Sequence, residues 1–286
     1  MSYILEPYDD ALRLILKEGK KRTDRTGVGN LSVFGIQSRY KIDEHFPLLT
    51  KRKIWPEAIF AELLWFISGS TNNKDLQELG SNIWTPWVDP EFERNHYYPE
   101  GSLGPVYGFQ LRYYGGNYNY GHHGNGYGWK GFDQLQYMMD LLKNDPQNRR
   151  ILFDLWNPKD LEFMRLPCCH YTFQLYVCDN KLSGILTQRS ADFPVGVPAN
   201  IQFYSALIYM MAQQVDLEPY EFVHSTVDSH IYLDQIDAVN EYLARPSPDS
   251  PKLNLKKAPD IYSYKMEDFG LENYKPEKPI KIPVAV

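Results

Sequence analysis

The sequence predicts an α+β fold in one large domain, and three observations lead to that class. Helical and alternating apolar patterns are mixed along the 286 residues without a strict strand–helix–strand rhythm. The composition is 43% hydrophobic and 23% charged, which is typical of a globular protein with a sizeable core. No internal repeat divides the chain. We therefore expect residues 1–286 to form a single domain.

The first third of the chain predicts two helices separated by a strand. Residues 7–19 carry apolar side chains at helical spacing and end at a glycine. A turn-rich segment over 24–30 leads into a β-rich stretch over 31–42. A second helix is expected from about 55 to 68, again ending at a glycine.

The second half predicts a hairpin followed by two helices. Residues 171–178 alternate cleanly, and Asp179-Asn180 turns the chain into a second strand over 181–188. Apolar residues at helical spacing predict a buried helix over 196–215. A further helix is expected over 232–243, before a proline-rich loop.

Residues 113–131 stand apart because they are dense in glycine, tyrosine, asparagine and histidine. So much glycine is costly to order, so we expect a mobile surface insertion. The pair His122-His123 lacks a third ligand with zinc-site spacing, and we therefore expect no metal.

Charge and hydropathy exclude several classes of protein. The net charge of −6 lacks the basic excess of duplex-binding proteins, so no obligatory nucleic acid is expected. No secretory signal and no run of about 18 apolar residues is present, so we expect no membrane association and a cytoplasmic location.

The three cysteines, Cys168, Cys169 and Cys178, form neither a disulfide framework nor a zinc pattern. A lone cysteine is more often a small buried hydrophobe than a nucleophile, so its surroundings must decide. A reactive thiolate needs positive charge nearby. Four arginines lie at turns or strand ends, and together they fit a phosphate clamp that would also activate a thiolate: Arg25, Arg149, Arg150 and Arg189.

Several short motifs in order along the chain resemble the folate-dependent, cysteine-using thymidylate synthase family. They are Asp24–Gly27, Glu62–Phe66, Leu103–Gly108, Arg149-Arg150, Pro167–His170, Gln188–Asp192, Pro198–Ile201, Asp228–Tyr232 and Pro283–Val286. The resemblance implies a mixed sheet that packs face to face with the sheet of a second copy in a homodimer, with helices on the other face. It also implies dUMP and 5,10-methylenetetrahydrofolate as substrates, with the folate donating both carbon and hydride.

The resemblance assigns the nucleotide-binding roles residue by residue. Cys169, directly before the histidine of its motif, corresponds to the nucleophile that attacks carbon 6 of the uracil ring. The phosphate falls to Arg25, Arg189 and Ser190, joined by Arg149 and Arg150 from the partner subunit. Asn200 corresponds to the amide that recognises uracil, and His230 and Tyr232 to the groups that bond the sugar hydroxyl.

The remaining family roles concern proton transfer and the folate. Glu62 interrupts an apolar helix, where helical phase alone leaves open whether it is exposed or buried with a raised pKa. The resemblance makes Glu62 the proton-transfer glutamate and Tyr107 the group that assists proton removal from carbon 5. Four residues correspond to folate-binding positions: Trp84, Asp192, Arg52 and Ala285.

Four positions depart from the family pattern: Ala199, Pro194, Thr85 and Arg52. Ala199 replaces an aromatic residue beside Asn200, which would leave costly space unless water or another side chain fills it. Related deoxypyrimidylate hydroxymethylases also depart from the synthase pattern here, and water quenches their methylene intermediate. The expected activity is thymidylate synthase, with deoxyuridylate hydroxymethylase as the alternative, because Trp84 and the Pro-Val-Ala-Val terminus are retained.

Overall fold

A six-stranded mixed sheet organises the protein. This computed structural model describes residues 4–24, 26–118 and 131–284. The strands lie in the order β1-β2-β6-β5-β4-β3, and β5 and β6 are parallel while the other neighbours are antiparallel. Their bounds are β1 (Lys20–Arg22), β2 (Asn30–Lys41), β3 (Leu152–Asp154), β4 (His170–Cys178), β5 (Lys181–Asp192) and β6 (Glu218–Tyr232). The fold is therefore α+β, as the sequence predicts.

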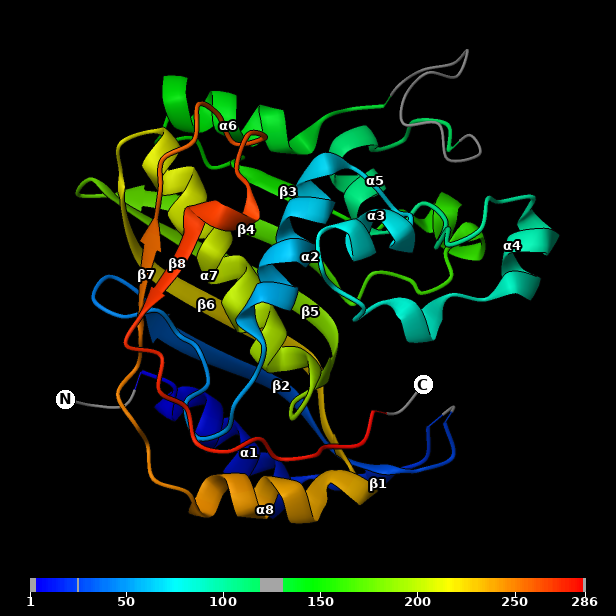
Figure 1. The fold of residues 1–286 in the computed structure, drawn as a ribbon, viewed down its shortest axis with the longest axis vertical. Helices are drawn as coiled ribbons and strands as arrows, with labels where there is room; N and C mark the ends of the chain where they lie inside the picture. Colours follow the sequence, from blue (N-terminus) through cyan, green and yellow to red (C-terminus); the bar gives the residue numbers. More distant parts are fainter. Residues whose placement is uncertain (1–3, 25, 119–130, 285–286) are drawn as a thin grey trace.

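Helices cover one face of this sheet. Strand β5 alternates between buried and half-buried positions, so Leu182, Gly184 and Leu186 share one face. A side chain at Gly184 would meet Ile208 of α7 (Gly196–Gln214), which identifies the face that α7 covers. Figure 1 shows α7 and α2 (Pro56–Ser68) crossing in front of the sheet, with α1 (Glu6–Glu18) beside β2.

The opposite face of the sheet keeps partly exposed side chains. Ile185 and Thr187 of β5 are half-buried, and Tyr176 of β4 is 66% exposed. Gln174 lies beside Ile185 in the strand register, and Arg39 lies beside Val223. An antiparallel sheet commonly leaves one face in contact with solvent or another surface.

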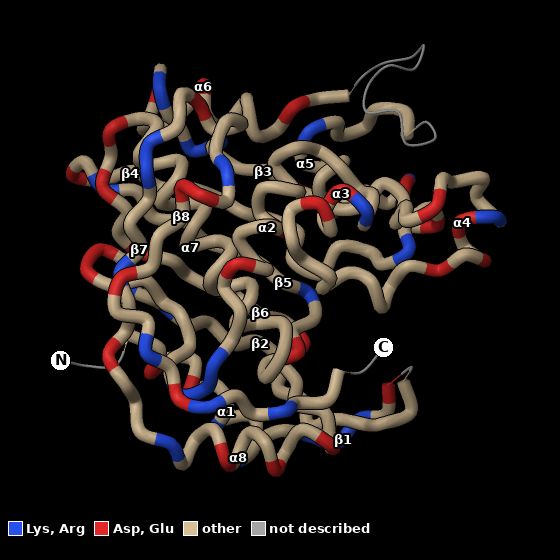
Figure 2. Tube along the Cα trace, viewed as in Figure 1, with Lys and Arg blue, Asp and Glu red and all other residues tan. Residues whose placement is uncertain are grey.

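The remaining elements surround the sheet and the α2–α7 pair. They are α3 (Asn73–Glu78), η1 (Thr85–Trp87), α4 (Pro90–His96), α5 (Tyr107–Tyr113), α6 (Gln134–Asn144), η2 (Pro158–Phe163), η3 (Leu233–Gln235), α8 (Ile236–Ala244), η4 (Met266–Asp268) and the hairpin of β7 (Lys252–Leu255) with β8 (Phe269–Glu272). Acidic and basic positions are interspersed along the described chain (Figure 2).

Most predicted elements are confirmed within one or two residues. The hairpin has Asp179 and Asn180 at φ of 49° and 61°, the left-handed conformation that such a two-residue turn requires. One prediction is wrong: the helix expected over 232–243 begins only at Ile236, because Tyr232 still pairs with Asn30 in the sheet. The 15-residue strand β6 was not predicted.

The structure describes only part of the chain that two further expectations concern, the insertion over 113–131 and the absence of a membrane span. Of the expected insertion 113–131, residues 119–130 lie outside the described part of the chain. Its two ends pair through Tyr114 and Phe132, whose backbone groups exchange hydrogen bonds of 3.1 and 3.0 Å. Across the described residues, no helix has both the length and the apolar character needed to cross a bilayer.

Candidate active site

Cys169 lies at the start of β4, beside a positively charged group. Its side chain is partly exposed, and its Sγ lies 3.6 Å from Nη2 of Arg189. The neighbouring strand brings this arginine close, because Arg189 N–H donates to the Cys169 carbonyl at 2.9 Å. The guanidinium therefore places a positive charge directly beside the sulfur of Cys169.

The Arg189 guanidinium is held in place by backbone carbonyls. Nε donates to the carbonyl of Cys168 at 3.0 Å, and Nη2 donates to that of Pro167 at 2.8 Å. The guanidinium also lies 5.4 Å from the centre of the Trp156 ring. These contacts direct a fixed positive charge at the segment that presents Cys169.

The adjacent cysteine has the opposite environment. Cys168 is fully buried, and burial raises the pKa of its thiol well above the ordinary value. A buried neutral thiol is a packing group rather than a nucleophile. The structure therefore separates two neighbouring cysteines that composition alone cannot distinguish.

Tyr107 and His170 form a packed support behind Cys169. The Cys169 N–H donates to the Tyr107 hydroxyl at 2.8 Å, and the Tyr107 ring stacks on His170 with centroids 4.4 Å apart. Burial raises the pKa of Tyr107 well above its usual value and lowers the pKa of His170 to about 3. Both are therefore neutral at pH 7. His170 Nδ1 lies 2.7 Å from the Tyr204 hydroxyl, a partner that the sequence did not indicate.

Glu62 faces the protein interior from α2. The indole N–H of Trp84 donates to its Oε1 at 2.6 Å. Burial raises the pKa of Glu62 to about 7, and this hydrogen bond limits the rise. Glu62 as a residue is half-buried, but its carboxyl is turned inward to Trp84, and its raised pKa suits proton transfer near neutral pH.

Glu62→Gln is expected to stabilise the protein at pH 8 and to change little at pH 5. In the unfolded chain the Glu62 carboxyl has a pKa of about 4.5, whereas in the folded protein its pKa is about 7. The free energy of unfolding therefore falls as the pH rises from about 4.5 to about 7, and it stays at the lower value at higher pH. An amide avoids this cost. The free energy of unfolding should therefore rise by about 1–3 kcal/mol at pH 8. Urea unfolding at fixed protein concentration measures it.

Glu57→Gln provides the matched control for this experiment. Glu57 lies in the first turn of the same helix and is exposed. Its replacement should leave the difference in stability between the two pH values unchanged. An equal gain at pH 5 and pH 8 for Glu62→Gln would contradict a raised pKa.

Asn200 lies in the first turns of α7, with its amide partly exposed and without a hydrogen-bond partner among the described residues. The preceding Ala199 is only half-buried. Phe203, four residues further along α7 and so on the same face as Ala199, is 4% exposed and packs edge-on against Phe66 at 5.1 Å. An aromatic ring one turn later therefore supplies packing beside Asn200 that Ala199 cannot.

The segment between β5 and α7 is fixed by contacts from distant parts of the chain. Tyr8 donates to the Phe193 carbonyl at 3.0 Å, and Arg52 donates to the Pro194 carbonyl at 2.7 Å. Burial raises the pKa of Asp192 to about 6, while nearby His230 and Gln235 oppose the rise. The Gln235 amide joins Asp192 to the carbonyl of Pro283 at 3.3 and 2.9 Å, so the C-terminal segment reaches this region.

The parallel pairing of β5 and β6 brings the other predicted nucleotide-binding residues together. Ser190 lies beside Asp228, and Asp192 lies beside His230. The rings of His230 and Tyr232 meet edge to face with centroids 5.1 Å apart. Thr85, one of the departures from the pattern, accepts amide hydrogen bonds from Asn73 and Gln77 at 3.3 Å each.

Two predicted arginines lie away from Cys169 of their own chain. Arg149 and Arg150 are exposed, and the Arg149 carbonyl accepts a hydrogen bond from Gln174 at 3.2 Å. Gln174 is five residues along β4 from Cys169, roughly 17 Å at about 3.3 Å per residue. Two further predicted residues, Arg25 and Ala285, lie outside the described part of the chain.

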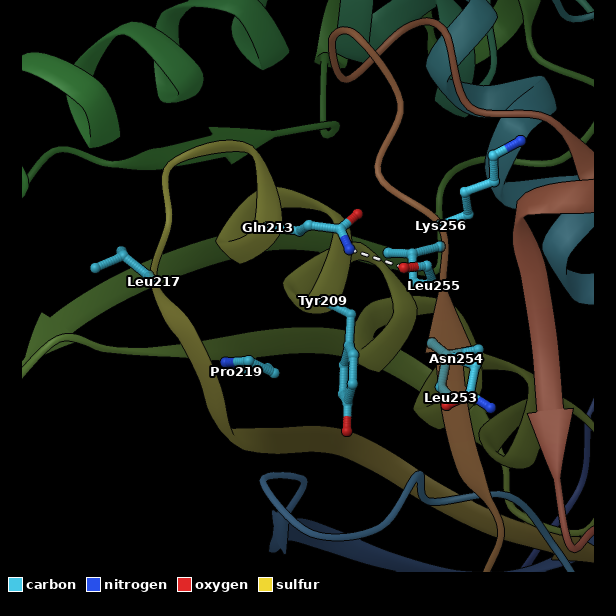
Figure 3. Close-up of a pocket in the computed structure, with 8 residues that line it drawn as sticks. All are labelled: Tyr209, Gln213, Leu217, Pro219, Leu253, Asn254, Leu255 and Lys256. Atoms are coloured by element: carbon cyan, nitrogen blue, oxygen red, sulfur yellow. Dashed lines mark hydrogen bonds between the residues drawn. The ribbon is translucent and has the colours of Figure 1, made fainter.

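A separate cavity of about 570 Å³ lies near the other end of α7. Figure 3 shows Gln213 directed at Leu255, whose carbonyl accepts a hydrogen bond of 2.8 Å from the Gln213 amide, while the Tyr209 ring points away from Leu255. Gln213 is thirteen helical residues from Asn200, roughly 20 Å along the axis at about 1.5 Å per residue. This cavity is thus distinct from the site at Cys169. Within the described ranges, no three His, Cys, Asp or Glu side chains gather as a metal site would require.

Comparison with known proteins decides the family. A family model of thymidylate synthase matches residues 6–286. The chain belongs to the thymidylate synthase family. It is 44% identical to the thymidylate synthase of Herpesvirus ateles over 98% of this chain and 97% of that protein. It is 43% identical to the human thymidylate synthase over 98% of this chain and 90% of that protein. The thymidylate synthase of Corynebacterium aurimucosum is 44% identical, over 98% of this chain and 97% of that protein.

Within this thymidylate synthase family member, the structure adds contacts that linear motifs did not reveal. Trp156 beneath Arg189, Tyr204 on His170 and Gln235 on Asp192 all come from distant positions in the chain. Asp228 was part of a recognised motif, yet only its neighbours His230 and Tyr232 were given roles. Its contacts become visible only when β2 and β6 are paired.

Proposed function

We propose that this protein is a thymidylate synthase, a one-carbon transferase that converts dUMP to dTMP with 5,10-methylenetetrahydrofolate. The observation that carries the proposal is Cys169, partly exposed and beside the Arg189 guanidinium, in a chain of this family. We place the protein in the cytoplasm as a single domain over residues 1–286.

Cys169 starts the proposed reaction. Its thiolate adds to carbon 6 of the uracil ring, and the electron pair moves to carbon 5, which then attacks the methylene carbon of the folate. The carbon 5 proton leaves, and its electron pair expels the folate nitrogen from the methylene carbon, which gives an exocyclic methylene and free tetrahydrofolate. Hydride from this tetrahydrofolate reduces the exocyclic methylene to a methyl group, and the sulfur departs from carbon 6 with its electron pair. The folate is thereby oxidised to dihydrofolate, and the thiolate is regenerated.

Glu62 and Tyr107 are the proposed proton-transfer groups. A carboxyl with a pKa of about 7 can both hold and release a proton at neutral pH, and Trp84 fixes its orientation. The Tyr107 hydroxyl lies against the backbone N–H of Cys169, which places it close to the carbon that the sulfur would attack.

The nucleotide would be held at both its ends. The Asn200 amide has no hydrogen-bond partner among the described residues, so it can donate to a ring carbonyl and accept from a ring N–H, as uracil requires. His230 and Tyr232 would bond the sugar hydroxyl. The phosphate would be bound by Ser190, Arg189 and Arg25 of one subunit, with Arg149 and Arg150 supplied by the other.

The proposed homodimer places the open sheet faces against each other. Within one chain, Arg149 and Arg150 are exposed, and the Arg149 backbone contacts Gln174, roughly 17 Å along β4 from Cys169 at about 3.3 Å per residue. The face with half-buried Ile185 and Thr187 and exposed Tyr176 is available for a second copy. A two-fold axis through this face would give each subunit the same complement of partner arginines.

The folate is assigned to the region around α2 and the segment before α7. Trp84 would pack on it, Asp192 would hold its pterin ring, and Arg52 and Ala285 would lie at its edges. The described parts of this region support the assignment, because Gln235 ties Asp192 to the C-terminal segment. No metal is invoked in this chemistry.

A product assay distinguishes the synthase from the alternative deoxyuridylate hydroxymethylase. With dUMP and methylenetetrahydrofolate we expect dTMP and dihydrofolate in equal amounts. The absorbance of dihydrofolate measures the progress of the reaction. The synthase is favoured because the compared relatives are named thymidylate synthases and because Phe203 packs on the same helix face as Ala199. Formation of 5-hydroxymethyl-dUMP with tetrahydrofolate would reverse this choice.

A further inference from the structure

Asp228 occupies the centre of a polar cluster between β1, β2 and β6. Its Oδ2 accepts a hydrogen bond from Nη1 of Arg22 at 2.7 Å, and its Oδ1 accepts one from the Ser32 hydroxyl at 2.6 Å. The same Oδ1 lies 3.4 Å from Nδ1 of His230. The carboxylate is therefore held by two donors and directed at the histidine ring.

Strand register explains why Ser32, Asp228 and His230 meet, and the long Arg22 side chain reaches them from β1. Ser32 lies directly opposite His230, and Arg22 lies opposite Asn30. Asp228 and His230 are two residues apart in β6, so their side chains share one face of the sheet. His230 is only 7% exposed and Asp228 is 33% exposed, so the contact is largely shielded from water.

The chemistry of the partners fixes the histidine proton. Besides the carboxylate, the backbone carbonyl of Asp228 lies 3.2 Å from Nδ1 of His230. Both neighbours of Nδ1 are acceptors, so Nδ1 must be the donor. In a neutral imidazole the other nitrogen, Nε2, is then an acceptor.

We propose that Asp228 is a positioning residue that fixes the orientation and tautomer of His230, so that Nε2 accepts a hydrogen bond from the sugar hydroxyl of the nucleotide. Arg22 and Ser32 hold the carboxylate for this purpose. The inference rests on the proposed function, because it takes the ligand to be dUMP with a free 3′-hydroxyl. A carboxylate that orients an imidazole through Nδ1 is a recurrent device in active sites.

Asp228→Asn tests the inference by reversing the hydrogen-bond polarity. Arg22 and Ser32 both donate, so the amide oxygen would turn toward one of them, and the amide N–H would face Nδ1. The backbone carbonyl of residue 228 still faces Nδ1, so the amide donor opposes it and the preference for a proton on Nδ1 is weakened. The tautomer with the proton on Nε2, which cannot accept from the hydroxyl, then becomes populated. We expect the Kd of dUMP, measured by calorimetry, to rise about tenfold.

The decisive comparison uses 2′,3′-dideoxyuridine monophosphate, which lacks the 3′-hydroxyl. Its Kd should change less than about twofold in Asp228→Asn, because the contact under test is absent. Equal weakening of both nucleotides would overturn the inference, since a distorted sheet would act on both. Glu218→Gln, at the exposed start of the same strand, should alter neither Kd.

Wild-type protein separates failure of the inference from failure of the proposed function. If it does not bind dUMP, the proposed function fails. If it binds dUMP and the dideoxy analogue equally, the hydroxyl contact does not exist and the inference is overturned. ¹⁵N spectra of labelled histidine give an independent reading without any substitution at Asp228. The His230 signal, assigned by comparison with His230→Gln, should show the proton on Nδ1, and a proton on Nε2 would overturn the inference.

Discussion

Cys169→Ser is expected to lower the turnover of dUMP by at least about 10³-fold, whereas Cys168→Ser keeps most of it. A serine hydroxyl beside Arg189 does not ionise near neutral pH, so the attack on carbon 6 is lost. Cys168 is fully buried, with a thiol pKa raised by burial, and its role is packing. Steady-state rates of dTMP formation measure the contrast.

Covalent capture distinguishes a chemical effect from a loss of binding. With dUMP and methylenetetrahydrofolate, mass spectrometry of wild type and Cys168→Ser should detect protein carrying the nucleotide, while Cys169→Ser carries none. The Kd of dUMP should remain within a few fold of wild type for both variants, because neither removes an arginine. Full activity of Cys169→Ser together with inactivity of Cys168→Ser would place the nucleophile one residue earlier.

The parts of the fold predicted correctly are those specified by local sequence. The Asp179-Asn180 turn and its alternating flanks define the β4–β5 hairpin, and glycines end both early helices. Strand β6 escaped prediction because its pattern is mixed: Phe222, Val223 and His224 are buried in succession, which hides the alternation. The same strand continues to Tyr232, and this delays the helix that was expected to begin there.

In the candidate site, too, features set by local sequence were predicted and features set by tertiary contacts were not. Its residue types were identified from motifs, but their partners depend on tertiary contacts that spacing does not encode. Trp84 and Glu62 are 22 positions apart, and the hydrogen bond between them joins the residue before η1 to α2. Whether Glu62 is buried could not be decided from helical phase. Phe203 could have been noticed four residues after Ala199, since i and i+4 share a helix face.

The gain in stability expected from Glu62→Gln bears on the function of Glu62. A buried carboxyl with a pKa near 7 is costly to the folded protein at higher pH. A sequence selected for stability alone would favour the amide at this position. A carboxyl at this position, despite its cost to stability, fits the proposed proton-transfer role of Glu62.

Hybrid dimers test whether Arg149 and Arg150 act across the subunit interface, and the expected effect is a return of activity from two inactive proteins. Cys169→Ser lacks the proposed nucleophile, and the double variant Arg149→Ala/Arg150→Ala lacks the two arginines. In a hybrid, the subunit with intact Cys169 receives intact arginines from its partner, so one of the two sites is complete. Equal mixing with random reassociation makes half the dimers hybrids, and activity should reach about a quarter of wild type.

Arginines that act within their own subunit would leave the mixture of the two variants inactive. If the arginines served their own subunit, neither site of the hybrid would be complete, and the mixture would stay inactive. A triple variant with all three substitutions in one chain, mixed equally with wild type, provides the control. Arginines acting across the interface leave only the wild-type dimers active, about a quarter of full activity, whereas arginines acting within one chain would give about half. The two mixtures together therefore identify the subunit that supplies the phosphate clamp.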